Sequence, residues 1–215
     1  MPIKNTEMRK EGMMKFNSLF PTLVTQFNHE FLFPDEMPNM INTIRQWSDE
    51  DDIIGTIAHK NHIDRHPHFR SLAKTIQTVA GVVAHKMGYE SDSIHDVNIK
   101  EMWASILKPE SHNTHKPHTH GNGVFSGVFY LKGGSDIILQ DPRPQVAVLR
   151  PRVANMNEFN IPNHHIPSTP GTGIIFPGWL SHYVPRTSEE RISVAFNIIL
   201  KGNYGQEGSL AELKL

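Results

Sequence analysis

The N-terminal part of the chain contains two stretches in which apolar residues recur with the period of a helix. In the first, apolar side chains return every three or four positions, at Met37, Met40, Ile41, Ile44 and Trp47. The second runs from about Phe69 to Met87 and is followed by Gly88, a residue typical of the position just after a helix. Ahead of both, Leu19–Phe27 has an extended pattern. We therefore predict one strand followed by two helices in residues 1–96.

Beyond about residue 97 the pattern changes to short strand-like runs separated by Gly, Pro and Asn. The predicted strands are Val97–Leu107, Val124–Leu131, Ile137–Gln140, Val146–Leu149, Thr172–Phe176 and Arg191–Leu200. The longest loop between them is predicted at Pro162–Thr172. Many short strands punctuated by turn residues are typical of a jelly roll or a barrel rather than of alternating βαβ units.

These patterns predict a mainly β protein with helical N-terminal support, an α+β arrangement around a double-stranded β-helix core of the jelly-roll or cupin kind. Residues 1–96 are predicted to form an extension whose strand and two helices pack on the core. The core itself is predicted to span residues 97–202, and residues 203–215 to form a C-terminal tail.

Composition and charge narrow the classes of function. Lys and Arg number 21 against 22 Asp and Glu, so the net charge of -1 gives no pull toward nucleic acid. Met1–Lys15 is polar and lacks the apolar segment of a signal peptide, and no run of about 18 apolar residues could span a membrane. The absence of Cys excludes disulfides, thiol nucleophiles and Cys-ligated metals. We expect a cytoplasmic protein that binds neither nucleic acid nor membrane, and apolar helix faces could support a homodimer.

Histidine is the unusual residue, with 14 copies, four of which fall within nine positions: His112, His115, His118 and His120. On an extended segment the spacing of His118 and His120 directs both side chains to the same side. Two imidazoles placed this way can chelate a divalent metal if a third ligand comes from elsewhere in the chain. The alternative is a solvated histidine-rich loop.

Two other histidine pairs serve as comparisons. His66 and His68 have the same spacing, but they precede a helix and no strand of candidate partners follows, so a surface position is predicted. His164 and His165 lie in the predicted long loop and are expected to be exposed, although such loops often contribute to the mouth of a site.

The last predicted strand has two different faces. One is apolar and consists of Ile192, Val194, Phe196 and Ile198. The other consists of Arg191, Ser193, Ala195 and Asn197. An arginine on the inner face of a small barrel is costly unless an anion meets it, and a small carboxylate held by Arg191 and a hydroxyl would justify its burial. The alternative is that Arg191 lies at the end of the strand and reaches solvent.

The order of these features resembles the Fe(II)/2-oxoglutarate-dependent oxygenases. The resemblance lies in Pro117-His-Thr-His-Gly followed by Ser126-Gly-Val-Phe-Tyr130, then Phe176-Pro-Gly-Trp-Leu-Ser-His182, and then Arg191-Ile-Ser193. It is strongest to a branch of small bacterial and phage members with a prolyl-hydroxylase-like core. It covers about Glu101–Lys201, roughly half of the chain.

The resemblance implies a role for each matching residue. His118 and His182 fall at metal ligands, and Arg191 falls at the residue that pairs with the distal carboxylate of 2-oxoglutarate. Tyr130 and Ser193 fall at positions that often add hydrogen bonds to that carboxylate. The implied cofactor is Fe(II), with 2-oxoglutarate and O2 as co-substrates.

His120 departs from the family pattern, because most members have Asp or Glu there. Two histidines and one carboxylate normally hold the iron, so a third imidazole leaves the site more positive by one charge. Asp141 is the nearest carboxylate that could replace His120 as ligand, although its place before a proline is more typical of a turn. His115 is a reserve candidate.

The function expected from the resemblance is hydroxylation of a C–H bond in a small-molecule or peptidyl substrate, with release of succinate and CO2. One alternative is a three-histidine dioxygenase of cupin type that does not use 2-oxoglutarate, in which Arg191 binds the carboxylate of the primary substrate. Another is a barrel without catalytic activity that binds a metal or a small acid.

Overall fold

Two antiparallel β-sheets form the framework of the chain. The computed structural model describes residues 17–29, 35–51, 55–89, 94–111, 114–143 and 151–215. The large sheet has seven strands: β1 (Thr25–Asn28), β8 (Thr172–Pro177), β5 (Phe125–Lys132), β10 (Arg191–Tyr204), β3 (Ile94–Leu107) and β2 (Gly55–Thr56) in that order, with β11 (Leu213–Lys214) paired to β10. The small sheet has the order β4 (His115–His118), β9 (His182–Val184), β6 (Ile137–Gln140) and β7 (Asn163–Ile166).

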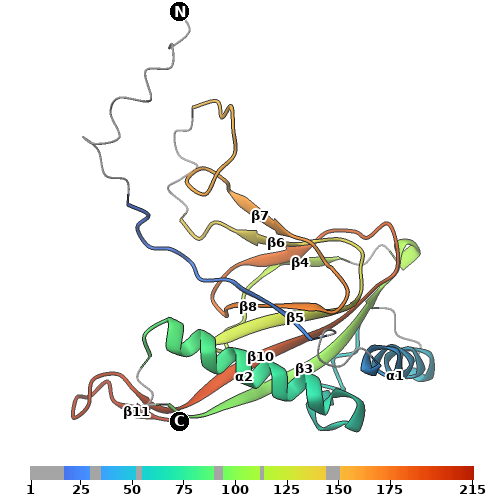
Figure 1. Cartoon of the computed structure of the whole chain (residues 1–215), viewed down its shortest axis with the longest axis horizontal. Helices are drawn as coiled ribbons and strands as arrows, with labels where there is room; N and C mark the ends of the chain where they lie inside the picture. The colour runs from blue at the N-terminus through green and yellow to red at the C-terminus, as the bar shows by residue number, and fades with distance from the viewer. Residues whose placement is uncertain (1–16, 30–34, 52–54, 90–93, 112–113, 144–150) are drawn as a thin grey trace, which may run out of the picture.

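Helices cover one side of the large sheet, and the small sheet lies on its other side (Figure 1). The two long helices are α1 (Glu36–Asp51) and α2 (Arg70–Lys86). Short 3-10 turns occupy η2 (Ile63–Arg65), η3 (Pro67–Phe69) and η4 (Pro109–Ser111). Within the described ranges, no helix combines the length and the apolar character needed to cross a membrane.

The chain has two hydrophobic cores because strands of the large sheet bury side chains on both faces. The outer core packs apolar side chains of β10, such as Val194 and Phe196, with Leu72 and Ile76 of α2. The inner core lies between the two sheets and consists of Leu107, Val128, Tyr130, Ile137, Leu139, Ile166, Ile174, Phe176, Leu180 and Val184. Alternate residues of one strand therefore serve different layers.

The two longest strands, β3 and β10, lie side by side and have 14 residues each. Their antiparallel register places Glu101 opposite Asn197, Trp103 opposite Ala195 and Ser105 opposite Ser193. Since paired residues project to the same face of a sheet, both strands contribute to one wall of the space between the sheets.

The predicted fold class is confirmed, with two facing antiparallel sheets and supporting helices. The two predicted helices are present, whereas the predicted strand Leu19–Phe27 shortens to β1. The division of the chain near residues 97 and 203 stays a prediction, although β1 pairs with β8 and β11 pairs with β10.

One loop prediction is wrong. Pro162–Thr172 contains β7, which pairs with β6 along four residues. Its polar sequence Asn163-His-His hides the strand, because these side chains bury little apolar surface and the pairing comes from the backbone. The predicted strand Val146–Leu149 lies outside the described residues.

Candidate metal and carboxylate site

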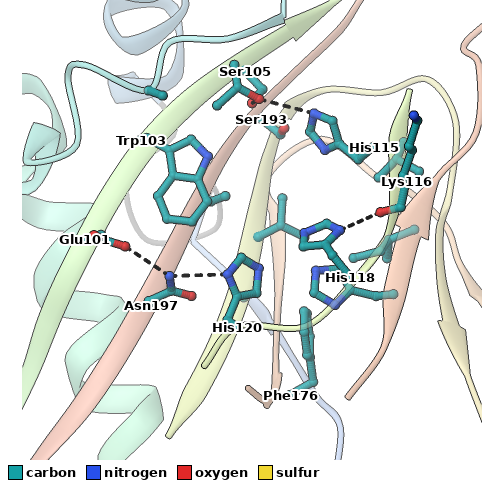
Figure 2. Close-up of a pocket in the computed structure, with 18 of the residues that line it drawn as sticks. Glu101, Trp103, Ser105, His115, Lys116, His118, His120, Phe176, Ser193 and Asn197 are labelled. Carbon is teal, nitrogen blue, oxygen red and sulfur yellow. Dashed lines mark hydrogen bonds between the residues drawn. The ribbon is translucent and has the colours of Figure 1, made fainter. Parts of the chain in front are cut away.

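Three histidines converge between the sheets. β4 and β9 are neighbours, and their register pairs His118 directly with His182. His120 follows two residues after the end of β4, and Figure 2 shows its ring close to that of His118. One nitrogen atom from each of the three rings lies within 4.8 Å of the others. His182 is buried, His120 is half-buried and His118 is exposed, so the cluster opens to solvent on one side.

Backbone carbonyls fix the tautomers of two of these histidines. Nδ1 of His118 lies 2.6 Å from the carbonyl oxygen of Lys116, and Nδ1 of His182 lies 2.9 Å from that of Leu180. Because a carbonyl oxygen only accepts, each Nδ1 must carry the proton, which leaves the Nε2 lone pair free for a metal. Burial lowers the pKa of His182 to about 4, so its imidazole is neutral at neutral pH, as ligation requires.

His120 has a different set of neighbours. Its Nδ1 lies 3.4 Å from the amide nitrogen of Asn197, a buried residue of β10 (Figure 2). Burial is the largest cause lowering the pKa of His120, and the neighbouring His118 lowers it further. Both effects favour the neutral form of the His120 ring.

Arg191 and its neighbours form a second polar group on the same wall. Its side chain is 1% exposed, its Nη1 donates to Ser193 Oγ at 2.8 Å, and its Nε donates to the carbonyl oxygen of Ser135 at 3.2 Å. Its guanidinium carbon lies 5.2 Å from the centre of the Tyr130 ring. In the described part of the chain, Arg191 has no ion pair with a carboxylate.

Tyr130 lies beside this arginine and has a polar atom without a partner. Its hydroxyl is buried and has no hydrogen-bond partner among the described residues. Burial raises the pKa of Tyr130 to about 12 and lowers that of Arg191. A buried cation beside an unused hydroxyl is costly unless an anion binds there. Arg191, Tyr130 and Ser193 thus have the chemistry of a carboxylate site.

One cavity of about 610 Å³ joins the histidine cluster to Arg191 and Ser193, while Tyr130 lies behind them and is not among the lining residues. The three histidines, Arg191 and Ser193 line it, and Phe176, Ile137 and Val184 form apolar parts of its wall. This volume is in the range of sites for small molecules. All four residues predicted on the polar face of the last strand line this cavity: Arg191, Ser193, Ala195 and Asn197.

The alternative metal ligands lie outside the histidine cluster. Asp141 accepts hydrogen bonds from the backbone nitrogen and the guanidinium of Arg143, as its interpretation as a turn residue implies. Nε2 of His115 lies 3.3 Å from Thr56 Oγ1, and burial lowers the pKa of His115 to about 4. The structure therefore brings together His118, His120 and His182 and leaves Asp141 and His115 out.

The histidines of the two comparison pairs lie apart from the cluster of His118, His120 and His182. His68 is exposed, and His66, just before η3, is half-buried and packs edge-on against Trp47. His164 and His165 are exposed on β7. His112 lies outside the described residues.

The part of the cavity wall that β3 contributes was not predicted from the sequence. Glu101, Trp103 and Ser105 all line the cavity from β3. The alternation of residues within Val97–Leu107 could have indicated this second face of the strand. The intervening Met102, Ala104 and Ile106 are apolar and are buried in the outer core. The strand was predicted, but its two faces were not assigned.

Comparison with known proteins agrees with this geometry. Residues 101–197 match the family described as "Putative 2OG-Fe(II) oxygenase". This segment is similar to that family. The match starts at Glu101 and ends at Asn197, so it contains all three histidines, Tyr130, Arg191 and Ser193. A comparison with curated proteins gave no match.

Solved structures share the fold of this chain at low sequence identity. A prolyl-4-hydroxylase from Pseudomonas putida is 14% identical, with a TM-score of 0.53 over 82% of this chain and 88% of its own. The epimerase SnoN from nogalamycin biosynthesis is 12% identical, with a TM-score of 0.57 over 88% of this chain and 83% of its own. The carbocyclase SnoK from the same biosynthesis is 11% identical, with a TM-score of 0.57 over 87% and 85%.

Proposed function

We propose that this protein is an Fe(II)- and 2-oxoglutarate-dependent dioxygenase that hydroxylates a C–H bond of a small-molecule or peptidyl substrate and releases succinate and CO2. The observation that carries the proposal is the presence of two complementary groups in one cavity. Three imidazoles within 4.8 Å suit a divalent metal, and a buried arginine without a carboxylate partner among the described residues suits one end of a dicarboxylate.

The residues present fit both cofactor and co-substrate. His118, His120 and His182 would hold Fe(II), which when bound supplies the activation of O2 that C–H oxidation requires. Two of the rings already have Nδ1 protonated against backbone carbonyls, so their orientation costs nothing further on metal binding. The buried hydroxyl of Tyr130 has no other partner among the described residues, so a carboxylate beside Arg191 would satisfy both groups.

The protein itself would bind and orient 2-oxoglutarate and would shield the site from water. Arg191 and Ser193 would fix the distal carboxylate of 2-oxoglutarate and thereby set the position of its reactive end relative to the histidines. Phe176, Val184 and Ile137 would limit the access of water, since they are buried and line the cavity. The primary substrate would enter through the exposed side, where His118 lies.

The class of primary substrate remains a proposal. The printed names of the structural neighbours include a prolyl hydroxylase, an epimerase and a carbocyclase, which shows how widely chemistry varies on this fold. A cytoplasmic location and a homodimer likewise stay predictions.

The deciding experiment incubates iron-loaded protein with 2-oxoglutarate under air and measures succinate. We expect slow succinate formation that His182→Ala abolishes together with metal binding, because His182 is the most buried of the three histidines. His164→Gln, on exposed β7, is the matched control and should leave both unchanged. Tight iron binding without succinate, with or without candidate substrates, would favour the 2-oxoglutarate-independent dioxygenase or the barrel without catalytic activity.

A further inference from the structure

A metal bound by three histidines lacks the negative charge that a carboxylate ligand would contribute. His118, His120 and His182 are neutral as ligands, so a divalent ion would keep its full charge apart from the co-substrate. In a cavity walled partly by apolar side chains, such a charge favours a nearby anion more strongly than it would in water. A carboxylate in the cavity wall, outside the histidine cluster, would supply such an anion.

Glu101 is that carboxylate. Among the described residues that line the cavity it is the single Asp or Glu. Within the described part of the chain it forms no ion pair with Lys, Arg or His. Its Oε2 instead accepts from two neutral amides, at 2.8 Å from Asn122 Nδ2 and 3.3 Å from Asn197 Nδ2. Its negative charge faces the cavity without a cation to neutralise it.

Asn197 connects this carboxylate to the histidine cluster. It is 1% exposed, and Ser126 Oγ donates to its Oδ1 at 2.8 Å, which holds the amide in place. The same Asn197 Nδ2 donates to Glu101 Oε2 and to Asn122 Oδ1, the latter at 3.2 Å, and it lies 3.4 Å from Nδ1 of His120. Figure 2 shows the resulting line from Glu101 through Asn197 to His120. The carboxylate is thus two hydrogen-bond lengths from the ring that occupies the usual carboxylate position.

We propose that Glu101, held by Asn197 against His120, supplies from outside the ligand set the negative charge that a carboxylate ligand would give to the metal. The inference rests on the metal site of the proposed function, and it adds Glu101 to that site as a positioning residue. The effect of Glu101 on the metal is electrostatic, because the Asn197 amide nitrogen is a donor and does not accept the ring proton of His120. Losing a polar partner behind a histidine ligand typically costs about 10–100-fold in metal affinity.

The test measures Co(II) binding to the full chain by its visible absorption, with Zn(II) in competition. Glu101→Gln keeps the shape and the amide contacts but removes the charge, and we expect Co(II) affinity to fall at least about tenfold. Glu101→Asp keeps the charge and should bind within about threefold of wild type. Glu110→Gln, an exposed carboxylate just beyond the other end of β3, is the matched control and should bind as wild type does.

A rescue variant shows whether Glu101→Gln acts by removing a charge or by disturbing the fold. Adding His120→Asp to Glu101→Gln returns one carboxylate to the site and should restore Co(II) affinity, with a change in the cobalt spectrum. The thermal unfolding midpoint of metal-free Glu101→Gln should match wild type, since a purely structural role would lower it.

The results for Glu101→Gln, His182→Ala and wild type distinguish failure of the inference from failure of the proposed function. Co(II) affinity of Glu101→Gln within twofold of wild type, while His182→Ala loses binding, overturns the role of Glu101 and leaves the proposed function intact. The same result with altered use of cationic substrates would assign Glu101 to the substrate instead. A wild-type chain that binds neither Co(II) nor Zn(II) would overturn the metal site and the inference together.

Discussion

At the scale of single residues, the site is defined by buried polar groups that lack a counter-ion or a hydrogen-bond partner among the described residues. Arg191 is a buried cation whose partners in the described part of the chain are neutral, namely the hydroxyl of Ser193 and the carbonyl of Ser135. Tyr130 has a buried hydroxyl with no partner among the described residues. Folding accepts such costs where a ligand later removes them, so these residues report the ligand more directly than the shape of the cavity does.

Arg191→Met should therefore change binding and stability in opposite directions. Loss of the charge-assisted bonds should weaken 2-oxoglutarate binding by about 2 kcal/mol, roughly 30-fold. Replacing a buried unpaired cation with an apolar side chain of similar length should leave the unfolding midpoint unchanged or higher. Calorimetric titration of the Zn(II)-loaded protein with 2-oxoglutarate measures the first effect, and thermal unfolding measures the second.

Arg143→Met is the control for this prediction, because Arg143 is exposed and pairs with Asp141. It should alter neither quantity. Unchanged 2-oxoglutarate affinity in Arg143→Met and in Arg191→Met alike would refute the carboxylate site.

The environment of His115 leads to a separate prediction, which concerns the pH dependence of stability. Burial, with Arg191 nearby, lowers its folded-state pKa to about 4, whereas an unfolded histidine titrates near 6.5. Between these values the unfolded state binds more protons than the folded state, so this contribution to stability is complete above pH 6.5 and is lost as the pH falls toward 4. In the metal-free protein His115→Gln should remove about 1–2 kcal/mol of the acid-induced loss of unfolding free energy.

Denaturant unfolding at pH 7 and pH 4.5 measures this effect. His165→Gln serves as the reference, because His165 is exposed on β7. Equal acid sensitivity of His115→Gln and wild type would show that His115 is not held neutral by the fold.

At the scale of elements, β10 organises the molecule, because it pairs with β3 on one side and β5 on the other. One face of β10 packs under the helices, and the other carries Arg191 and Asn197 along the cavity. The close approach of its neighbour β5 depends on Gly127. A Cβ at that position would overlap the ring of Phe196 and the carbonyl oxygen of Ile174.

Gly127→Ala should accordingly destabilise the protein by about 2–3 kcal/mol, because the strand and the Phe196 ring must separate to make room. Gly81→Ala in α2 is the matched control, and it should change the free energy of unfolding in the opposite direction. Its Cβ would make only an ordinary contact with Val97, and replacing a helical glycine should stabilise by about 0.5–1 kcal/mol. Urea unfolding of the two variants checks both signs, and destabilisation by Gly81→Ala would contradict the packing described for α2.

At the scale of the whole molecule, two cores separate the helical support from the site. Leu72 of α2 lies in the outer core, while Ile137 lies between the sheets and also lines the cavity. Damage to the outer core should therefore lower stability without reaching the ligands of the site.

Leu72→Ala and Ile137→Ala provide the comparison. Each should lose about 3 kcal/mol of unfolding free energy through the cavity that it creates. At a temperature where both variants are folded, Leu72→Ala should bind Co(II) and 2-oxoglutarate as wild type does, whereas Ile137→Ala should bind 2-oxoglutarate more weakly. Equal loss of binding in both variants would show that the two cores are energetically coupled.

The sequence predicted those parts of the molecule that depend on periodicity. The two faces of β10 and the meeting of His118 with His120 follow from residue alternation, although their roles as ligands and anchors stay predictions. What could not be predicted depends on pairing between distant strands. The line from Glu101 to His120 requires the β3–β10 register, and β7 owes its structure to β6 rather than to its own polar residues.

The two outermost strands of the large sheet are short. β1 has four residues and β2 has two, whereas the strands between them reach 14 residues. A brief outer strand offers a second chain few free backbone groups for pairing, and natural proteins use this device against aggregation. The long inner strands that carry the site are therefore shielded from intermolecular β-pairing, and a truncation that removed β1 would expose the edge of β8 and promote aggregation.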